Sequence, residues 1–264
     1  YWLMLAGILL IVAYAFFVRG HYNRFSDRLA EAKRRFSKTR LLTLVLFLGF
    51  LLTGGWIYYN TAVLNTYTSS KEREQIRMNY ELTYKQYEGI VQPRWVHFDY
   101  EIDIHPYERD LFVRAATVVV NKSDVAIDSL HFTLPGAVRP VNIQINIPGA
   151  TLTLDDARHG YRIYTLAQPL MPGDSLAIEV RSEIVTRGFE NEVSFASLTQ
   201  NGTFFNNFDV MPSLGYQAMY EVQNPTRRAR LGLPERARMP VLDENDLVSR
   251  GNHYINNDSD WITM

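Results

Sequence analysis

The sequence predicts a membrane-anchored, mainly β protein with two transmembrane helices, an amphipathic stalk helix and an antiparallel β-sandwich. Three observations predict this fold. Two uncharged runs of 18 and 19 residues lie within the first 59 residues. A short segment after them places apolar residues at helical spacing. From residue 94 onwards, apolar and polar residues alternate between turn-rich separators.

The two uncharged runs, 1–18 and 41–59, are predicted to cross a membrane. As helices they would be about 27 and 29 Å long, close to the thickness of about 30 Å of the hydrocarbon core. Aromatic residues at their ends, such as Tyr1, Trp2 and Trp56, suit the membrane interface. The alternatives are a buried helix of a soluble protein and a signal peptide. A buried helix is not favoured, because a short basic loop separates the two runs. A signal peptide is not favoured, because the first run has neither a basic leader before it nor a cleavage motif after it.

The loop between the runs, residues 19–40, is predicted to lie in the cytoplasm. It holds eight basic and two acidic residues, and short loops this basic stay on the cytoplasmic side. Residues 60–264 are then extracytoplasmic. This loop is either a simple topology anchor or a helix that contacts a cytoplasmic partner. The helix is indicated by apolar residues at helical spacing on a basic background, as on an anionic membrane surface: Phe25, Leu29, Ala32 and Phe36.

Residues 60–93 are predicted to form a stalk that contains one amphipathic helix, residues 70–88. The pair Ser69 and Glu72 has the spacing of a capping box, and Gly89 ends the pattern. The apolar stripe of this helix is Ile76, Tyr80, Tyr84 and Tyr87. We expect the stripe to pack on the domain that follows, with a binding platform as the alternative.

Residues 94–264 are predicted to form the β-sandwich, truncated at its C-terminus. Short strands joined by turns, with no helices between them, are typical of an antiparallel sandwich. The predicted strands are 95–104, 111–120, 127–134, 141–147, 151–154, 161–166 and 175–185. After Thr186 the pattern weakens. We expect a short strand at 204–208, a compact loop at 212–216, a chain crossing the sandwich surface at 224–240, and no partner for the strand-like residues 261–264.

Composition excludes several classes of function. The chain has no cysteine, which excludes disulfides, thiolate metal sites and cysteine nucleophiles. Residues 60–264 carry a net charge of −7 and residues 1–59 a net charge of +6. A C-terminal part this acidic excludes a basic nucleic-acid-binding domain there. The patterns of nucleotide-binding loops and of serine hydrolases are also missing.

The histidines do not predict a zinc site. No HExxH pair is present, and no two histidines are four residues apart. His97 and His105 bracket one predicted strand, and we expect them on opposite faces. Surface positions are therefore preferred over a metal site for all six histidines, which are His21, His97, His105, His131, His159 and His253.

The acidic clusters suggest no catalytic pair either. Asp155 and Asp156 are adjacent, and neighbouring side chains of an extended chain point apart. The acidic run 243–246 lacks EF-hand spacing, so a solvated loop is expected there. The sequons at Asn121, Asn201 and Asn257 matter only in a host that glycosylates them.

The arginine cluster outside the predicted spans is Arg227, Arg228, Arg230, Arg236 and Arg238. We expect these side chains to pair with acidic groups of the sandwich or of a neighbouring part of the protein. Binding of an anionic ligand is the alternative.

Several segments resemble a family of bacterial fusion proteins. These proteins join an ABC transporter permease-like membrane region to a periplasmic aminopeptidase N-like zinc metallopeptidase. The resemblance covers essentially the whole chain and depends on the order and spacing of many short motifs. They include Asn60-x-x-x-Leu64-Asn65-x-Tyr67, Tyr80-Glu81-x-x-Tyr84-Lys85-x-Tyr87, Gln92-Pro93-Arg94, Val120-Asn121-Lys122-Ser123, Ile127-Asp128-Ser129-Leu130, Pro169-Leu170-x-Pro172-Gly173-Asp174-Ser175-Leu176, Asn201-Gly202-Thr203-Phe204-Phe205 and Pro212-Ser213-Leu214-Gly215-Tyr216.

The resemblance implies that residues 94–264 are most of the saddle-like N-terminal sandwich domain of such a peptidase. In that family the catalytic domain follows, with a zinc-binding HExxH helix, a more distant Glu ligand, a GxMEN-type loop that holds the substrate amine, and a transition-state-stabilising Tyr. None of these motifs occurs here. The resemblance therefore assigns no catalytic, cofactor-binding or metal-binding residue to this chain, which alone should not hydrolyse peptides.

The sequence leaves three hypotheses. In the first, the chain is a fragment of a hydrolase in the bacterial inner membrane, with zinc in a catalytic domain outside it. Its partners are then the lipid bilayer, that catalytic domain, upstream transmembrane helices of the same polypeptide, a peptide substrate and an ABC ATPase, with no nucleic acid. In the second, it is a complete membrane-tethered sandwich that binds a ligand without chemistry. In the third, it is an ABC permease subunit with an extracytoplasmic domain.

Overall fold

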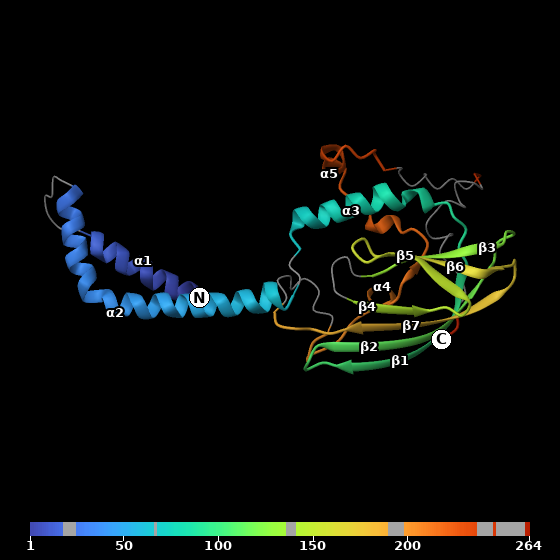
Figure 1. The fold of residues 1–264 in the computed structure, drawn as a ribbon, viewed down its shortest axis with the longest axis horizontal. Helices are drawn as coiled ribbons and strands as arrows, with labels where there is room; N and C mark the ends of the chain where they lie inside the picture. The colour runs from blue at the N-terminus through green and yellow to red at the C-terminus, as the bar shows by residue number, and fades with distance from the viewer. Residues whose placement is uncertain (18–24, 66–67, 136–140, 190–197, 237–244, 247–261) are drawn as a thin grey trace. The chain divides into compact units, whose positions relative to one another are not determined.

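The computed structural model describes residues 1–17, 25–65, 68–135, 141–189, 198–236, 245–246 and 262–264 (Figure 1). The chain divides into two compact units. One unit comprises residues 1–67 with 187–194, and the other comprises residues 68–186 with 195–264. The first is helical and the second is mainly β.

The helical unit contains α1 (Trp2–Phe16) and α2 (Phe25–Tyr58), and a π-helical turn (Tyr59–Val63) continues α2. The helix indicated over residues 25–36 is confirmed, but it is not separate from the second span, because α2 runs without a break from Phe25 to Tyr58. Residues 25–40 are rich in Ala, Leu, Arg, Lys and Glu, which favour helix, and contain no Gly or Pro to interrupt it. The basic segment and the second apolar run therefore belong to one helix.

Small residues bring α1 and α2 close together. A Cβ atom added to Gly7 would lie 3.0 Å from the side chain of Leu46, and one added to Gly49 would lie 3.0 Å from Met4. At the other end of α1, the Arg35 guanidinium donates a hydrogen bond of 2.5 Å to the carbonyl of Phe17. This bond satisfies a carbonyl that the end of α1 leaves without a helical partner.

The helix that continues from Phe25 to Val63 is 39 residues long and apolar enough to cross a membrane by length and composition. At 1.5 Å per residue it is about 58 Å long, nearly twice the hydrocarbon thickness. The described α1 is shorter, with 15 residues. The two predicted spans therefore correspond to one long and one short apolar helix.

The β unit contains two antiparallel sheets of four strands. Sheet A has the order β1-β2-β7-β4 and sheet B the order β5-β6-β3-β8. The strands are β1 (Arg94–His105), β2 (Asp110–Val120), β3 (Ile127–Thr133), β4 (Asn142–Asn146), β5 (Ala150–Asp156), β6 (Tyr161–Leu170), β7 (Ser175–Ile184) and β8 (Ser213–Leu214). The seven strands predicted before Thr186 are confirmed.

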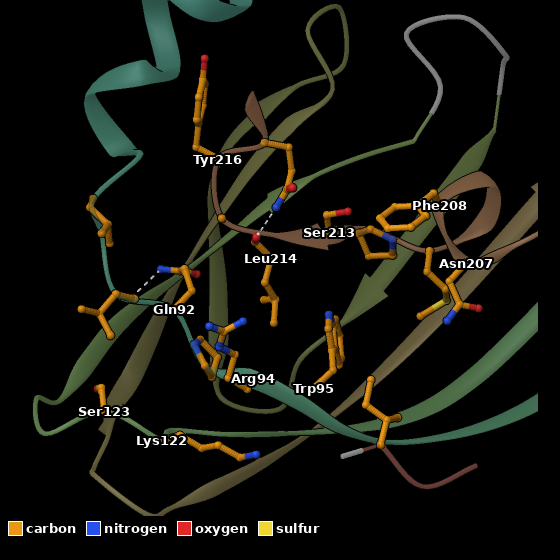
Figure 2. Close-up of a pocket in the computed structure, with 18 of the residues that line it drawn as sticks. Gln92, Arg94, Trp95, Lys122, Ser123, Asn207, Phe208, Ser213, Leu214 and Tyr216 are labelled. Carbon is orange, nitrogen blue, oxygen red and sulfur yellow. Dashed lines mark hydrogen bonds between the residues drawn. The ribbon is translucent and has the colours of Figure 1, made fainter. Parts of the chain in front are cut away.

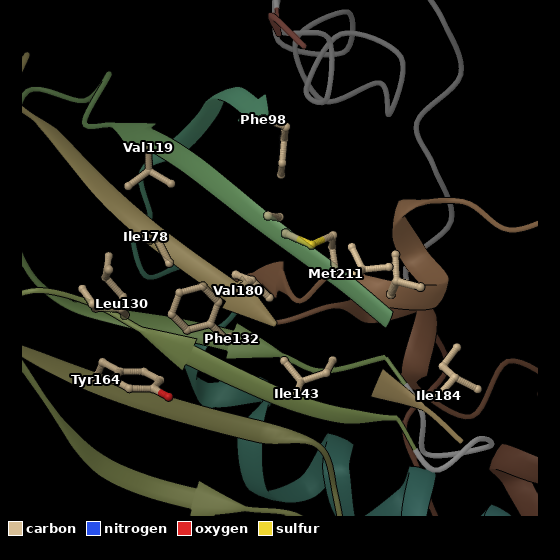
Figure 3. Packing of buried hydrophobic residues seen from close by; sticks show 14 of the residues in the cluster. Phe98, Val119, Leu130, Phe132, Ile143, Tyr164, Ile178, Val180, Ile184 and Met211 are labelled. Carbon is tan, nitrogen blue, oxygen red and sulfur yellow. The ribbon is translucent and has the colours of Figure 1, made fainter. Parts of the chain in front are cut away.

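The two sheets share one apolar core (Figure 3). Alternate residues of β2 and β7 face inward from sheet A, such as Val119 and Val180, and meet Leu130 and Phe132 of sheet B. The solvent-facing residues of the same strands are polar more often, as the alternation predicts. The sandwich therefore follows directly from the period-two pattern.

Helix α3 (Ser70–Tyr84), which ends in a 3₁₀ turn (Lys85–Tyr87), lies over sheet B on the side away from sheet A (Figure 1). The Ser69 side chain accepts a hydrogen bond from the Glu72 amide, which confirms the predicted N-cap. Tyr80 and Tyr84 are buried against Tyr161 and Tyr216. The Tyr stripe thus packs on the following domain, as expected.

The chain after β7 differs from its prediction in four places. A helical turn, α4 (Asn207–Val210), lies where 204–208 was predicted as a strand, because a reciprocal capping box of Asn206 and Asp209 starts it. Two residues of the expected 212–216 loop form β8, and α5 (Pro225–Arg230) interrupts the expected crossing segment. Residues 261–264 were expected to lack a partner, but Thr263 pairs with β1.

Candidate functional site

A groove of about 700 Å³ in the described β unit can hold a ligand (Figure 2). Five segments meet around it: β1 with the chain before it, the turn between β2 and β3, α4, the chain around β8, and Ile262 near the C-terminus. Figure 2 shows Leu214 above Arg94 and Trp95, with Lys122 below them. Distant parts of the sequence therefore build this groove.

Gln92 fixes one wall of the groove. Its side-chain nitrogen donates to the carbonyl of Ser129 at 3.2 Å, and its oxygen accepts from the amide of His131 at 2.8 Å. On the facing segment, the Gly215 amide donates to the carbonyl of His131 at 2.8 Å. Gly215 has a φ of 73°, which a side chain would disfavour, and an added Cβ would touch Gln92. The wall is thus held by backbone as well as side chains.

The surface of the groove is mostly apolar with two cations near it. Phe208 is 60% exposed, and Ile90 and Val91 are also exposed. Arg94 and Lys122 line the same space and already have partners. The hydroxyl of Ser123, which also lines the groove, donates to the side-chain oxygen of Asn121 at 2.6 Å. The exposed apolar residues suit the groove to binding a partly apolar group.

A buried ionic cluster lies between α3 and α5. Arg228 donates to both carboxylate oxygens of Glu81, at 2.7 and 2.6 Å, and both side chains are 3% exposed. These hydrogen bonds from Arg228 to Glu81 raise the pKa of the guanidinium above its usual value, against an opposing effect of burial. A bidentate arginine–carboxylate pair is a strong and directional contact.

Glu221 is the second acid of the cluster and is 1% exposed. It accepts hydrogen bonds from Lys85 and from the Tyr216 hydroxyl, both at 2.9 Å, and lies 2.9 Å from Arg236. Burial alone would raise the pKa of Glu221, but the hydrogen bonds from Lys85 and Tyr216 outweigh it and lower the pKa. Glu221 is therefore held as a carboxylate.

A second polar cluster fixes the C-terminal end of α3 to the turn between β5 and β6. Asp156 accepts a hydrogen bond of 2.5 Å from the Tyr84 hydroxyl and lies 2.6 Å from Nδ1 of His159. Burial opposes the charged form of Asp156, but these contacts lower its pKa below the usual value. The hydroxyl of Tyr84 has a raised pKa, because it is buried and faces the carboxylate. Tyr84 therefore stays a neutral donor.

The described histidines lie apart from one another. His97 and His105 lie on the same face of β1, and the expectation of opposite faces is wrong because the register with β2 is regular between them. Eight residues of strand separate them by about 27 Å, too far for one metal. The surface position expected for His131 is wrong, because β3 lies between the core and α3: its ring is buried between Tyr161 and Ser129, and burial lowers its pKa. His21 and His253 lie outside the described residues.

The structure also places the other sequence candidates. Asp155 pairs with Arg162 while Asp156 contacts Tyr84, so the adjacent acids have separate roles, as expected. Of the acidic run 243–246, only residues 245–246 are described.

Three of the five arginines in the predicted cluster meet acidic partners. Arg227 is 3.6 Å from Glu74, Arg228 pairs with Glu81, and Arg236 pairs with Glu221. Arg238 lies outside the described residues.

The three sequons differ in accessibility. Asn121 is fully buried and donates to the carbonyls of Val125 and Leu170, so it is not accessible for glycosylation in the folded unit. Asn201 is exposed, and Asn257 lies outside the described residues.

The described residues do not fit a zinc ion. Within them, no group of three or more His, Cys, Asp or Glu side chains comes close enough to hold a metal. His159 and Asp156 provide two such groups, but hydrogen bonds to Tyr84 and to backbone amides already occupy the Asp156 carboxylate. We therefore derive no metal-dependent step for these residues.

Sequence reasoning did not find the groove or the partners of the ionic cluster. Their residues come from segments more than a hundred positions apart, such as Glu81 and Arg228. A local pattern cannot show which acid meets which arginine. One signal was available: Glu81 lies beside the Tyr stripe of α3, where a helix that packs on a sheet would bury it.

No family model and no curated protein matches the chain. Among solved structures, the chain is similar to a two-domain M1 zinc metallopeptidase, crystallised as a mutant bound to L-tryptophan. The sequences are 15% identical, the match covers 36% of this chain and 21% of that one, and the TM-score is 0.27. This chain thus spans about a fifth of the length of that relative. The likeness is a distant one, and the activity of that enzyme does not transfer to this chain on its account.

Proposed function

We propose that this chain is the membrane-anchored, non-catalytic part of a larger aminopeptidase N-like zinc metallopeptidase joined to a permease-like region. Helices α1 and α2 anchor the protein in the inner membrane of a bacterium. The β unit lies on the extracytoplasmic side and supports a catalytic domain outside these 264 residues. That domain holds the zinc and the peptide substrate. The sequence motifs and the order of apolar helices followed by a β-sandwich support this proposal.

One observation carries the non-catalytic role. The buried acids and bases of the β unit are used to hold its parts together: Glu81 with Arg228, and Glu221 with Lys85. Asp156 likewise fixes α3 to the β5–β6 turn. Groups that are committed to such contacts are not available to activate water or bind a substrate. The β unit is therefore a rigid support for neighbouring parts of the protein.

Membrane anchoring and orientation can be tested by labelling single cysteines, since the chain has none of its own. We expect a cysteine replacing the exposed Asn201 to react with a membrane-impermeant maleimide in spheroplasts. A cysteine replacing Ser37, in the basic part of α2, should react only after the membrane is opened. Recovery of the chain in the soluble fraction, or the reverse labelling pattern, would contradict the anchoring.

The peptidase assignment needs a separate test. The purified full chain should bind no stoichiometric zinc and should not hydrolyse an aminoacyl p-nitroanilide. The natural reading frame should continue into an HExxH motif downstream and into further apolar helices upstream. A stop codon directly after Met264 would overturn the assignment, and so would one bound zinc per chain.

A second function, binding without catalysis, is favoured by the groove of about 700 Å³ beside Trp95 and Phe208. Under this alternative the chain is a tethered binding module. Screening short peptides for quenching of tryptophan fluorescence, with Trp95→Phe as the control, separates it from the first function. A ligand for the isolated chain, together with a stop codon after Met264, would favour this second function. The resemblance also leads us to propose an ABC ATPase as a partner. Co-purification of an ATPase with the full chain, in which α2 is intact, would test this proposal.

A further inference from the structure

After β7 the chain returns from the β unit to the end of α2. Residues 187–194 follow β7 in the sequence but belong to the helical unit, and the structure describes residues 187–189 of them. Asn65, just beyond the end of the helix, holds these three residues. Its side-chain amide donates to the carbonyl of Arg187 at 2.6 Å and to that of Phe189 at 3.0 Å. Residues 187–189 are called the return segment below.

The carbonyl of Asn60 is the second holding point of the return segment. Asn60 lies in the π-helical turn that continues α2, and carbonyls near the end of a helix lose their helical partners. Its carbonyl accepts from the side chain of Asn65 at 2.8 Å and from the amide of Phe189 at 3.3 Å. Gly188 permits this approach, because its φ is 59° and an added Cβ would lie 2.5 Å from the Asn60 oxygen. The return segment is thus fixed to the helix end through its backbone.

This attachment places Phe189 among the aromatic residues at the end of the apolar run. Its ring packs edge-on against the ring of Trp56, with the ring centroids 4.9 Å apart. Tyr58 and Tyr59 follow within one helical turn, on other sides of the helix, and both are exposed. Trp and Tyr are enriched where transmembrane helices leave the hydrocarbon core, since their rings join apolar surface to a polar group. These four residues form an aromatic collar built from two distant segments.

We propose that the return segment is a second membrane contact, with Phe189 beside Trp56 in the headgroup layer of the extracytoplasmic leaflet. This proposal rests on the proposed function, since it requires that α2 spans the membrane with this end outside. The partner of the collar is phospholipid. The collar continues the apolar run 41–59, and this continuity favours lipid over a soluble partner. The β unit is then connected to the membrane surface both before α3 and after β7.

Spin labels on single cysteines test the proposal in the full chain, reconstituted into phospholipid vesicles. One label replaces Phe189, and reference labels replace Leu48 in the apolar run and Asn201 in the β unit. The accessibility of each label to oxygen, which concentrates in lipid, is compared with its accessibility to a water-soluble nickel chelate. The oxygen-to-nickel ratio at position 189 should lie below that at position 48 and several-fold above that at position 201.

Two variants test whether the attachment to the helix end sets this depth. Gly188→Ala introduces the clash with Asn60, and Asn65→Ala removes the donor to the return segment. Each should lower the ratio at position 189 to the level at position 201, because the segment leaves the helix end. Gly149→Ala, where an added Cβ has no atom within 4 Å, is the control and should leave the ratio unchanged. The label at position 48 should stay in lipid in all three variants.

The ring of Phe189 is tested by proteolysis of the unlabelled chain. Phe189→Ser removes the ring, and we expect trypsin added outside the vesicles to cleave after Arg187 several-fold faster. Phe189→Tyr keeps a ring suited to the headgroup layer and should be cleaved at the rate of the unmodified chain. Equal cleavage of the serine and unmodified chains would contradict a role for this ring.

The outcomes separate this proposal from the proposed function on which it rests. If the label at position 189 is as accessible to nickel as the label at position 201 while position 48 lies in lipid, the second contact is overturned and anchoring stands. If position 48 is open to nickel, anchoring by α2 is overturned together with the second contact. If the label at position 189 is immobile and shielded from both oxygen and nickel, protein covers the collar, and the assignment of lipid as its partner is overturned.

Discussion

Arg228 holds both carboxylate oxygens of Glu81 across 147 positions of sequence, and both side chains are almost completely buried. Glu81 lies on α3, at the start of the β unit, and Arg228 lies on α5, in the chain that follows the sandwich. The pair therefore ties the first helix of the unit to its C-terminal segment. Buried charges of this kind are costly when one partner is removed.

Replacing Arg228 should strongly destabilise the β unit. In Arg228→Met, the carboxylate of Glu81 stays buried without its partner, and Glu221 loses a nearby cation. We expect a loss of about 3–5 kcal/mol in the free energy of unfolding, measured by urea denaturation with tyrosine fluorescence. The matched control is Arg227→Met. Its side chain is 58% exposed and lies 3.6 Å from Glu74, so it should cost less than about 1 kcal/mol.

If Arg228→Met and Arg227→Met lower the free energy of unfolding equally, burial of the Arg228–Glu81 pair does not determine its contribution to stability. The double variant Glu81→Gln with Arg228→Met refines this test. It removes both charges, so it should recover part of the loss seen with Arg228→Met alone. A further loss in the double variant would contradict the assignment of Glu81 as the partner.

The acid stability of the β unit should depend on Asp156 and Glu221. The pKa values of both carboxyl groups are lowered in the folded state, so the unfolded state binds more protons at acidic pH. Their contribution to stability is complete above the unfolded pKa of about 4 and is lost as the pH falls through the lower folded value. Asp156→Asn should reduce stability at neutral pH and flatten the acid limb of the stability curve. Asp155→Asn, at a 40% exposed position, should leave that limb unchanged.

His131 should add a pH dependence at higher pH. Burial lowers its pKa below the usual value of about 6.5, so the folded state favours the neutral imidazole. The unfolded state binds the proton first, and stability should fall as the pH drops below about 6.5. His131→Asn should remove this slope below about pH 6.5. His105→Asn is the control, since that ring is 45% exposed and its Nε2 lies 3.1 Å from the exposed carboxylate of Asp103. If the slope persists in His131→Asn, a group other than His131 causes this pH dependence of stability.

The sequence predicts the seven strands before Thr186 and the packed stripe of α3, since each depends on a local pattern. Alternation places Val119 and Phe98 in the core, and helical spacing places Tyr80 and Tyr84 against the sheet. It indicates a helix from Phe25 but not its continuation into the second apolar run, because the charges of residues 25–40 separate the two patterns while their helix propensity joins them. It also does not predict the groove, the pairing of Glu81 with Arg228 or the contact of Thr263 with β1. These depend on which distant segments the fold brings together.

A glycine in the helical unit gives the last prediction. Gly188 has a φ of 59°, and a Cβ atom added there would lie 2.5 Å from the carbonyl oxygen of Asn60. An alanine at this position meets both a disfavoured backbone conformation and a backbone clash that no side-chain movement relieves. Gly188→Ala should release the segment from the end of α2 and increase trypsin cleavage after Arg187 by about tenfold or more, measured by mass spectrometry.

The control for this variant is Gly149→Ala. Gly149 has a similar φ of 71°, but an added Cβ would have no atom within 4 Å. Gly149→Ala therefore has the same backbone cost as Gly188→Ala, about 1–2 kcal/mol, but no clash. Gly149 also lies in the β unit and not in the helical unit. Cleavage after Arg187 should stay at the level of the unmodified protein. An unchanged cleavage rate in Gly188→Ala would show that this segment does not depend on close contact with Asn60, and the return of the chain to the end of α2 would then need another explanation.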